Sequence, residues 1–208
     1  MVNYTIKHHF SHIGEPSKEA YIQFFKDVSN RTLEMIIDWQ RVGFVHGVMN
    51  TDNMSILGLT IDYGPYGWLE GYDYGWTPNT TDRQHKRYRY GNQPNMGLWN
   101  LLQLANAIYP LINEAEPLEA ILNQYKIDFD TKSLNMKRSK LGLGLEIEQD
   151  ELLIQDLEDI LHLTETDMTI FFRNLSSFKK STPSEGVKII NKAFYVPEDI
   201  TGNIKKRW

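Results

Sequence analysis

The strongest constraint on the fold is a helical pattern across residues 17–43. Apolar side chains recur there at the three- and four-residue spacing of one helix face: Tyr21, Phe24, Phe25, Val28, Met35, Ile36 and Trp39. Ser17 suits the N-cap position, and Gly43 suits a left-handed stop at the C-terminal end. The sequence therefore predicts one long helix that begins after Ser17, runs to about Val42 and buries its apolar face.

Further helical patterns fill the second half of the chain. One runs from about Met96 to Tyr109, ends at Pro110, and is apolar enough that we expect it to be buried. Shorter patterns cover Leu118–Tyr125, Asp130–Leu141, Asp150–Leu163 and Asp167–Leu175, the last with Thr166 as its N-cap. These patterns predict a mainly α fold.

A small β-hairpin is predicted between the first two helices. Two short apolar runs, residues 55–57 and 60–62, flank Gly58 and Leu59. Glycine at the first central position favours a two-residue type II′ turn. Residues 63–95 are rich in glycine, proline and aromatic residues and show no lasting periodicity, so we expect a long ordered loop of the kind that often carries function.

Composition excludes several classes of function. The chain has 208 residues, is 41% hydrophobic and has a net charge of −5, which indicates a globular protein without a nucleic-acid partner. A local basic stretch, residues 83–89, alternates with aromatic residues and could stack on nucleotides, but packed tyrosines and solvated arginines explain it better. The absence of cysteine excludes thiolate metal sites and a cysteine nucleophile. No apolar run approaches the roughly 20 residues of a membrane helix, so we expect no membrane partner.

The chemically informative segment is residues 46–54, which read HGVMNTDNM, together with residues 61–64, which read IDYG. In protein kinases a histidine opens the catalytic loop, an asparagine seven residues later binds metal, and the aspartate of an Asp-Phe-Gly motif binds the same metal. His46 and Asn53 have this spacing, and Asp62 ends the predicted hairpin. In that register Asn53 and Asp62 share one face about 7–8 Å apart at the backbone, so one ion could bridge them.

One amide oxygen and one carboxylate suit Mg²⁺, or Mn²⁺ in its place, because such an ion keeps several waters and takes its other ligands from substrate phosphates. The pair therefore implies a nucleotide. The competing interpretation is a turn in which Asp52 and Asn53 only cap backbone groups. Kinases place their base two residues after the histidine, where Val48 stands here, so Asp52 is the candidate base; it could equally orient the loop.

Several longer strings point to a known family. Residues 45–58 (VHGVMNTDNMSILG) and 60–65 (TIDYGP) closely resemble the signature of the selenoprotein O family. Residues 88–94 (YRYGNQP) and 98–101 (LWNL) are further matches, and residues 167–173 (DMTIFFR) are a weaker one. The strings occur in the expected order and cover most of the chain to about residue 177.

This resemblance implies a protein-kinase-like α+β fold that transfers AMP, rather than phosphate, from ATP to hydroxyl groups of Ser, Thr or Tyr on protein substrates. The implied site has Asp52 as proton acceptor and Asn53 and Asp62 as Mg²⁺ ligands, with Asp62 also bordering the nucleotide. Two alternatives stay open. One is a non-catalytic helical fragment or pseudoenzyme, and the other is a kinase that transfers the γ-phosphate, against which Val48 argues.

The resemblance also implies that residues 1–177 correspond to the C-terminal lobe and residues 178–208 to a polar extension. Only 45 residues precede His46, and no Gly-x-Gly-x-x-Gly occurs, so we expect the ATP-gripping N-terminal lobe to be absent from this chain. We accordingly expect the 208-residue chain alone not to transfer AMP efficiently. A bacterial source would imply a cytoplasmic location, although a targeting segment could be missing from the sequence.

Overall fold

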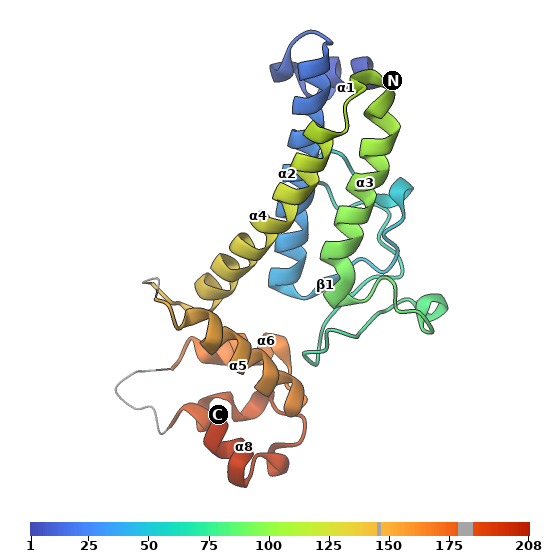
Figure 1. Cartoon of the computed structure of the whole chain (residues 1–208). Helices are drawn as coiled ribbons and strands as arrows, with labels where there is room; N and C mark the ends of the chain where they lie inside the picture. The colour runs from blue at the N-terminus through green and yellow to red at the C-terminus, as the bar shows by residue number, and fades with distance from the viewer. Residues whose placement is uncertain (145–146, 179–184) are drawn as a thin grey trace.

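The computed structural model describes residues 1–144, 147–178 and 185–208. Its helices and strands, in chain order, are α1 (Val2–His9), α2 (Lys18–Val42), β1 (Phe44–Val45), β2 (Gly67–Trp68), α3 (Gln93–Ile112), α4 (Glu116–Leu141), α5 (Asp150–Leu163), α6 (Met168–Leu175), α7 (Gly186–Ile190) and α8 (Gly202–Arg207). Short 3₁₀ turns lie at Ser11–Ile13, Thr51–Asn53, Thr80–Asp82, Tyr90–Asn92, Asn191–Ala193 and Pro197–Asp199. The prediction of a mainly α fold is confirmed (Figure 1).

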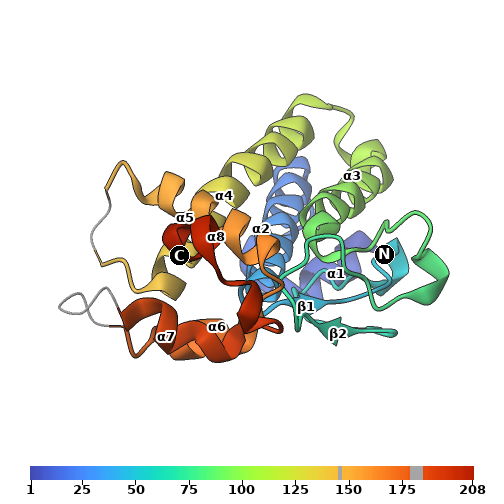
Figure 2. The same cartoon turned by 90° about the horizontal axis from the view of Figure 1, so that it is seen from below.

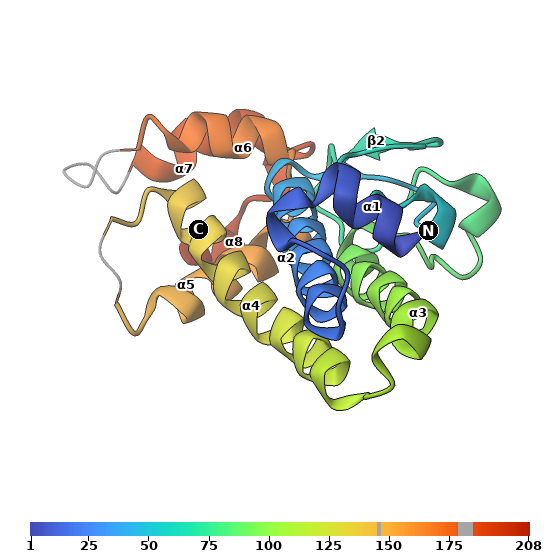
Figure 3. The ribbon, with the colours of Figure 1, turned by 90° about the horizontal axis from the view of Figure 1, so that it is seen from above.

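The long helix α2 forms as its caps predict. The Ser17 hydroxyl accepts a hydrogen bond from the Ala20 N–H at 3.1 Å, and Gly43 ends the helix in the left-handed region at φ 72°. The apolar stripe is buried from Phe24 to Trp39. In Figure 3, α2 lies between α3 and α4, so this helix forms the centre of the bundle.

Three hydrophobic clusters hold the described residues together. The largest joins α1, α2, α3 and α4 around Phe25, Leu33 and Ile108. A second, smaller cluster packs Trp39, Phe44 and Met49 beneath the loop that follows β1. The third joins residues 69–92, the middle loop between β2 and α3, to the C-terminal helices, whose packing beside the strands is visible in Figure 2. It includes Val45, Leu69, Leu161, Met168, Phe171, Ile190, Phe194 and Ile200. The division of the chain near residue 177 stays a prediction.

The predicted bounds of α3 and α4 need correction. α3 begins at Gln93 because Pro94 suits the first helical turn, and it continues past Pro110 to end at Asn113 in the left-handed region. The missing N–H of Pro110 costs little there, because the helix ends only one turn later. α3 was expected to be buried, and one of its faces is, but the other is exposed, with Trp99 at 39% and Leu102 at 42%.

α4 is one helix rather than the two shorter ones predicted, because no glycine or proline interrupts residues 118–141. α5 has the predicted bounds. In α6 the N-cap is Asp167, whose carboxylate accepts the Ile170 N–H at 2.7 Å. Thr166, the predicted cap, is instead fully buried, and its hydroxyl bonds to that of Thr164 at 2.9 Å.

The predicted hairpin at residues 55–62 is wrong. Ser55 to Gly58 form a turn in which the Gly58 N–H donates to the Ser55 carbonyl at 3.2 Å, and no strand is assigned to these residues. Gly58, at φ 70°, is the last residue of that turn and lies against the backbone of Arg31 in α2. The two-stranded antiparallel sheet forms elsewhere, with Phe44 opposite Trp68 and Val45 opposite Gly67.

The middle loop is irregular and is ordered by its own contacts, as predicted. Tyr90 is buried, and its hydroxyl donates to the Gln40 carbonyl at 2.7 Å. Arg87 is exposed and lies over the ring of Trp99 at 4.7 Å. These positions match the expectation of packed tyrosines and solvated arginines. In the described part of the chain, no helix has the length and apolar character to cross a membrane.

Candidate functional site

The loop that begins at His46 is anchored by side chains from α3 and from the middle loop. Gln93 is fully buried; its amide oxygen accepts the His46 N–H at 2.9 Å, and its amide nitrogen donates to the Phe44 carbonyl at 2.8 Å. Asn79 donates to the Gly47 carbonyl at 3.0 Å, and Asn100 donates to the Met49 carbonyl at 3.0 Å. Buried amides thus satisfy the backbone of a loop that has no regular structure of its own.

The His46 ring connects this loop to the segment that carries Asp62. Its Nε2 lies 2.8 Å from the Ile61 carbonyl, and its Nδ1 lies 3.4 Å from the Val48 N–H. A ring that accepts at Nδ1 and donates from Nε2–H is neutral. Burial lowers the pKa of His46, while the bond to the Ile61 carbonyl and the charge of Asp62 act in the opposite direction. Both findings indicate that His46 acts as a positioning group.

Asn53 is tied to the same loop. Asn53 is the last residue of the 3₁₀ turn Thr51–Asn53, and its amide nitrogen donates to the Val48 carbonyl at 3.0 Å. Hydrogen bonds therefore run from Ile61, next to Asp62, through the His46 ring and Val48 to Asn53. The hydrogen bond to the Val48 carbonyl identifies the donating atom of the Asn53 side chain as its nitrogen. The other atom is therefore the oxygen, which is the atom that could bind a metal ion.

The Asp-Tyr-Gly-Pro segment lies directly on the loop at Gly47. Gly47 has a φ of 84°, and a Cβ placed on it would lie 1.8 Å from the Pro65 carbonyl oxygen. Asp62 also has a positive φ, 48°, a conformation that aspartate tolerates better than most residues. Asp52 and Asp62 are both exposed, so both carboxylates are accessible to a ligand.

The structure therefore brings the two predicted motifs together by a route that differs from the predicted one. Asn53 and Asp62 were expected to be neighbours across a hairpin, and that hairpin does not form. The link is the buried His46 ring instead. Sequence reasoning gave no role to the clamping residues Gln93 and Asn100, although both lie within the strings that resemble the selenoprotein O signature.

An aromatic face borders the Asp62 segment. It consists of Phe44, Tyr63, Tyr66 and Trp68, whose ring centres lie 5.0 Å (Tyr63–Tyr66), 5.5 Å (Tyr66–Trp68) and 5.4 Å (Phe44–Trp68) apart. Phe44 is buried, whereas Tyr63, Tyr66 and Trp68 are 45%, 47% and 54% exposed. This edge-on ring packing holds the exposed side chains in place without burying them.

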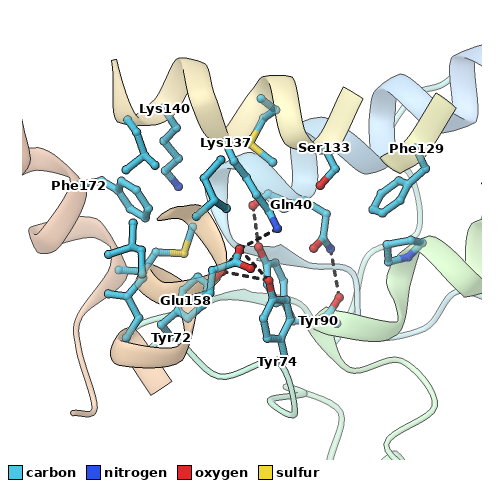
Figure 4. A pocket seen from close by; sticks show the side chains of 18 residues that line it. Gln40, Tyr72, Tyr74, Tyr90, Phe129, Ser133, Lys137, Lys140, Glu158 and Phe172 are labelled. Atoms are coloured by element: carbon cyan, nitrogen blue, oxygen red, sulfur yellow. Dashed lines mark hydrogen bonds and ion pairs between the residues drawn. The ribbon is translucent and has the colours of Figure 1, made fainter. Parts of the chain in front are cut away.

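A buried polar network lies behind the middle loop, around a small cavity of about 150 Å³ (Figure 4). The hydroxyls of Tyr72 and Tyr74 donate to one oxygen of Glu158 in α5 at 2.9 and 3.0 Å, and Lys137 of α4 pairs with the same carboxylate at 2.8 Å. Burial raises the pKa of both tyrosines, and the charge of Glu158 raises them further, so the hydroxyls remain donors. The network joins the loop to two helices.

Lys140 also lines this cavity, beside Phe172 at the left of Figure 4. Its ammonium group donates to the Arg41 carbonyl at 2.6 Å and lies 3.9 Å from the centre of the Phe172 ring. Burial, aided by the charge of Arg41, lowers the pKa of Lys140 to about 8. The cavity is too small for a nucleotide, since ligand pockets of that kind have volumes of about 300–1,000 Å³.

His46, Asn53 and Ile61, which a chain of hydrogen bonds connects, all lie within the strings that resemble the selenoprotein O signature. The chain belongs to that family: the sequence model described as "Protein adenylyltransferase SelO" matches residues 1–208.

Curated relatives agree with this assignment. A "Protein nucleotidyltransferase YdiU" of Flavobacterium johnsoniae is 62% identical over 209 residues, covering 100% of this chain and 40% of that relative. Proteins of the same description from Rhodopirellula baltica and Aromatoleum aromaticum are 48% and 50% identical, covering 97% and 95% of this chain and 40% and 38% of those relatives. The chain thus spans about 40% of the length of the curated relatives that it matches.

Proposed function

We propose that this chain carries the metal- and nucleotide-contacting part of a protein adenylyltransferase, which moves AMP from ATP to hydroxyl side chains of proteins. The observation that carries the proposal is the His46 link, because it organises Asn53 and the residue next to Asp62 through one buried ring. Membership in the SelO family supports the reaction class. The proposal includes a kinase-like fold, of which this chain would form the C-terminal lobe.

The residues present fit a magnesium ion. Asn53 offers an amide oxygen, because its nitrogen is already committed to Val48, and Asp62 offers an exposed carboxylate. Within the described ranges, no three or more His, Cys, Asp or Glu side chains are grouped to hold a metal. A site with two protein ligands suits Mg²⁺, which takes its remaining ligands from water and phosphate oxygens. When bound, the ion would neutralise charge on the phosphates of ATP.

Asp52 is the proposed proton acceptor for the attacking hydroxyl. It lies beside Asn53 in the same 3₁₀ turn, and its side chain is exposed. A base must come within hydrogen-bond reach of the proton that it removes. An exposed carboxylate one residue from the proposed metal ligand is accessible to a protein hydroxyl that approaches from solvent.

The test uses a protein that carries this chain at the full length of its curated relatives. Incubated with Mg²⁺ and ATP, it should add AMP to a protein hydroxyl, detected by intact mass and peptide sequencing. Asp62→Ala and Asn53→Ala should reduce transfer at least about a hundredfold, in line with the loss of a group that stabilises transition-state charge. Asp130→Ala, an exposed change on α4, should leave transfer unchanged.

Two results would overturn the proposal. A mass increase of one phosphate instead of one AMP would indicate a kinase. Transfer that is equal in the Asp62→Ala variant and the Asp130→Ala control would remove Asp62 from the site. The 208-residue chain alone is expected to show no steady AMP transfer.

A further inference from the structure

An open pocket of about 700 Å³ lies beside β2, whose Trp68 is one of its lining residues. Its walls are rich in aromatic rings and carboxylates, and the lining residues are Trp68, Glu70, Gly71, Tyr72, Asp73, Trp76, His162, Glu165 and Tyr195. This volume is within the range of pockets that bind small molecules or single side chains. None of the residues assigned above to metal or proton transfer lines it, so the pocket is separate from that site.

Three distant chain segments build the pocket through main-chain hydrogen bonds. The Tyr72 N–H donates to the Thr166 carbonyl at 3.0 Å, and the Met168 N–H donates to the Glu70 carbonyl at 2.8 Å. The Tyr195 N–H donates to the Glu165 carbonyl at 3.3 Å. The pocket is therefore preformed, which reduces the ordering cost of binding.

Packing also fixes the aromatic walls. The Trp76 ring lies over Gly67, where an added Cβ would come within 2.6 Å of it. Tyr72 is held by Glu158, and its ring packs against His162 with ring centres 5.3 Å apart. Trp68 is packed by Phe44 and Tyr66 yet 54% exposed. Trp68, which is both held by its neighbours and exposed, is therefore suited to contact a ligand.

The charge of the pocket has one sign. Glu70, Asp73 and Glu165 line it, and no lysine or arginine of residues 1–144, 147–178 and 185–208 does. None of these three carboxylates forms an ion pair within those ranges. The pKa of Tyr195 is raised, first by burial and then by the charges of Asp167, Glu70 and Glu165. A negative potential therefore acts on the pocket.

We propose that this pocket binds a cationic side chain, lysine or arginine, of the acceptor protein. Aromatic faces attract a cation through their negative quadrupole, and nearby carboxylates add to this attraction. The two together select a positive charge and disfavour a neutral or acidic side chain. This inference rests on the proposed function for its assignment to the acceptor protein, but the binding itself does not depend on AMP transfer.

The location of the pocket suits an acceptor protein. Trp68 belongs both to the pocket and to the aromatic face, and Tyr63 of that face directly follows Asp62 in the chain. A bound protein segment with its cationic side chain in the pocket could cross the exposed rings toward Asp62. The pocket would then help to determine which hydroxyl is presented.

The binding test uses the 208-residue chain and indole ¹⁵N–¹H NMR signals, with Trp68 and Trp76 assigned from single Trp→Phe variants. The probes are short peptides in which one lysine or one arginine is the only charged group. A matched peptide carries an Nε-acetylated lysine in place of the lysine. We expect the signals of Trp68 and Trp76 to shift with the cationic peptides, while Trp39 does not. The acetylated peptide should leave all signals unchanged.

The charge requirement is tested by the triple variant Glu70→Gln, Asp73→Asn, Glu165→Gln. Its affinity should be at least about tenfold weaker, because the carboxylates and rings each contribute a modest attraction. The matched control makes the same charge change at exposed residues outside the pocket, Glu15→Gln, Asp130→Asn and Glu148→Gln, and should bind normally. Circular dichroism should show both variants folded. Equal binding by the two variants, or equal shifts with acetylated peptide, would overturn the proposal.

A second measurement separates this inference from the proposed function. In the full-length protein, the triple variant should raise the KM for a protein acceptor and leave the KM for ATP unchanged. Peptide binding at Trp68 and Trp76 without AMP transfer would refute the proposed function and leave the cation site intact. AMP transfer without cation-dependent shifts of the Trp68 and Trp76 signals would refute the cation site and leave the proposed function intact.

Discussion

Glu158 offers the sharpest test of how the middle loop is held. Its carboxylate accepts hydrogen bonds from two tyrosine hydroxyls, Tyr72 and Tyr74, and pairs with Lys137. We predict that Glu158→Ala destabilises the chain strongly. The substitution removes the acceptor of two partly buried hydroxyls. Their contact with each other, at 3.1 Å, remains.

The expected size follows from these contacts. A hydrogen bond to a charged group contributes about 1.5–3 kcal/mol. The Lys137 ion pair adds less, on the order of 0.5 kcal/mol, because its side chain is 29% exposed and that of Glu158 is 20% exposed. Because the two hydroxyls are only partly buried and keep their contact with each other, each bond should contribute toward the lower end of its range, and we expect a loss of about 3–5 kcal/mol in the free energy of unfolding. For a chain of this length, that loss corresponds to a decrease in Tm of roughly 10 °C.

The assay is urea and thermal unfolding followed by circular dichroism. Asp159→Ala is the matched control, because it removes a neighbouring exposed carboxylate from the same helix and should change stability by about 0.5 kcal/mol or less. Glu158→Gln should fall between the two, because the amide oxygen still accepts from the tyrosines. If Glu158→Ala and Asp159→Ala unfold at the same urea concentration, the network does not hold the loop.

Three further predictions follow from individual contacts. Gly47→Ala should prevent stable packing of the loop, because its Cβ would meet the Pro65 carbonyl oxygen; loss of amide protection at residues 46–54 in hydrogen exchange would show this. Burial raises the pKa of four tyrosines, Tyr72, Tyr74, Tyr90 and Tyr125. As the pH rises, the unfolded chain loses their protons before the folded chain does, so the free energy of unfolding should fall above about pH 10 when unfolding is measured as a function of pH. Lys140 has the opposite effect, because burial lowers its pKa to about 8. Above that pH the unfolded chain binds more protons at this residue than the folded chain, so the contribution of Lys140 to the free energy of unfolding should rise from about pH 8 to pH 10. Lys140→Met should remove that rise, and an unchanged pH profile would contradict it.

Local signals explain what the sequence predicts correctly. The ends of α2 depend on Ser17 and Gly43, and both act within one helical turn of themselves. α5 likewise has its predicted bounds. The split predicted for α4 is wrong because shorter apolar patterns suggested two helices, whereas residues 118–141 contain no glycine or proline to end one.

Non-local contacts explain what the sequence does not predict. The strands β1 and β2 are two residues each and pair across the loop between them, so neither shows an alternating pattern. The hairpin prediction relied on Gly58, but that residue packs against α2 instead of turning a strand. The motif residues at the site follow from spacing, whereas their support by Gln93 and Asn100 comes from α3 and depends on the tertiary fold. The pocket proposed to bind a cation combines residues 68–76 with residues 162–195, which no local pattern connects.

The most direct test of the central claim is Mn²⁺ binding in the presence of ATP, measured by electron paramagnetic resonance on the full-length protein. If the His46-anchored loop places Asn53 and Asp62 around one ion, Asp62→Ala should weaken Mn²⁺ binding at least about tenfold, which corresponds to about 1.4 kcal/mol. Asp130→Ala should bind like the unaltered protein. Undiminished Mn²⁺ binding by Asp62→Ala would contradict the metal site on which the proposed adenylyl transfer depends.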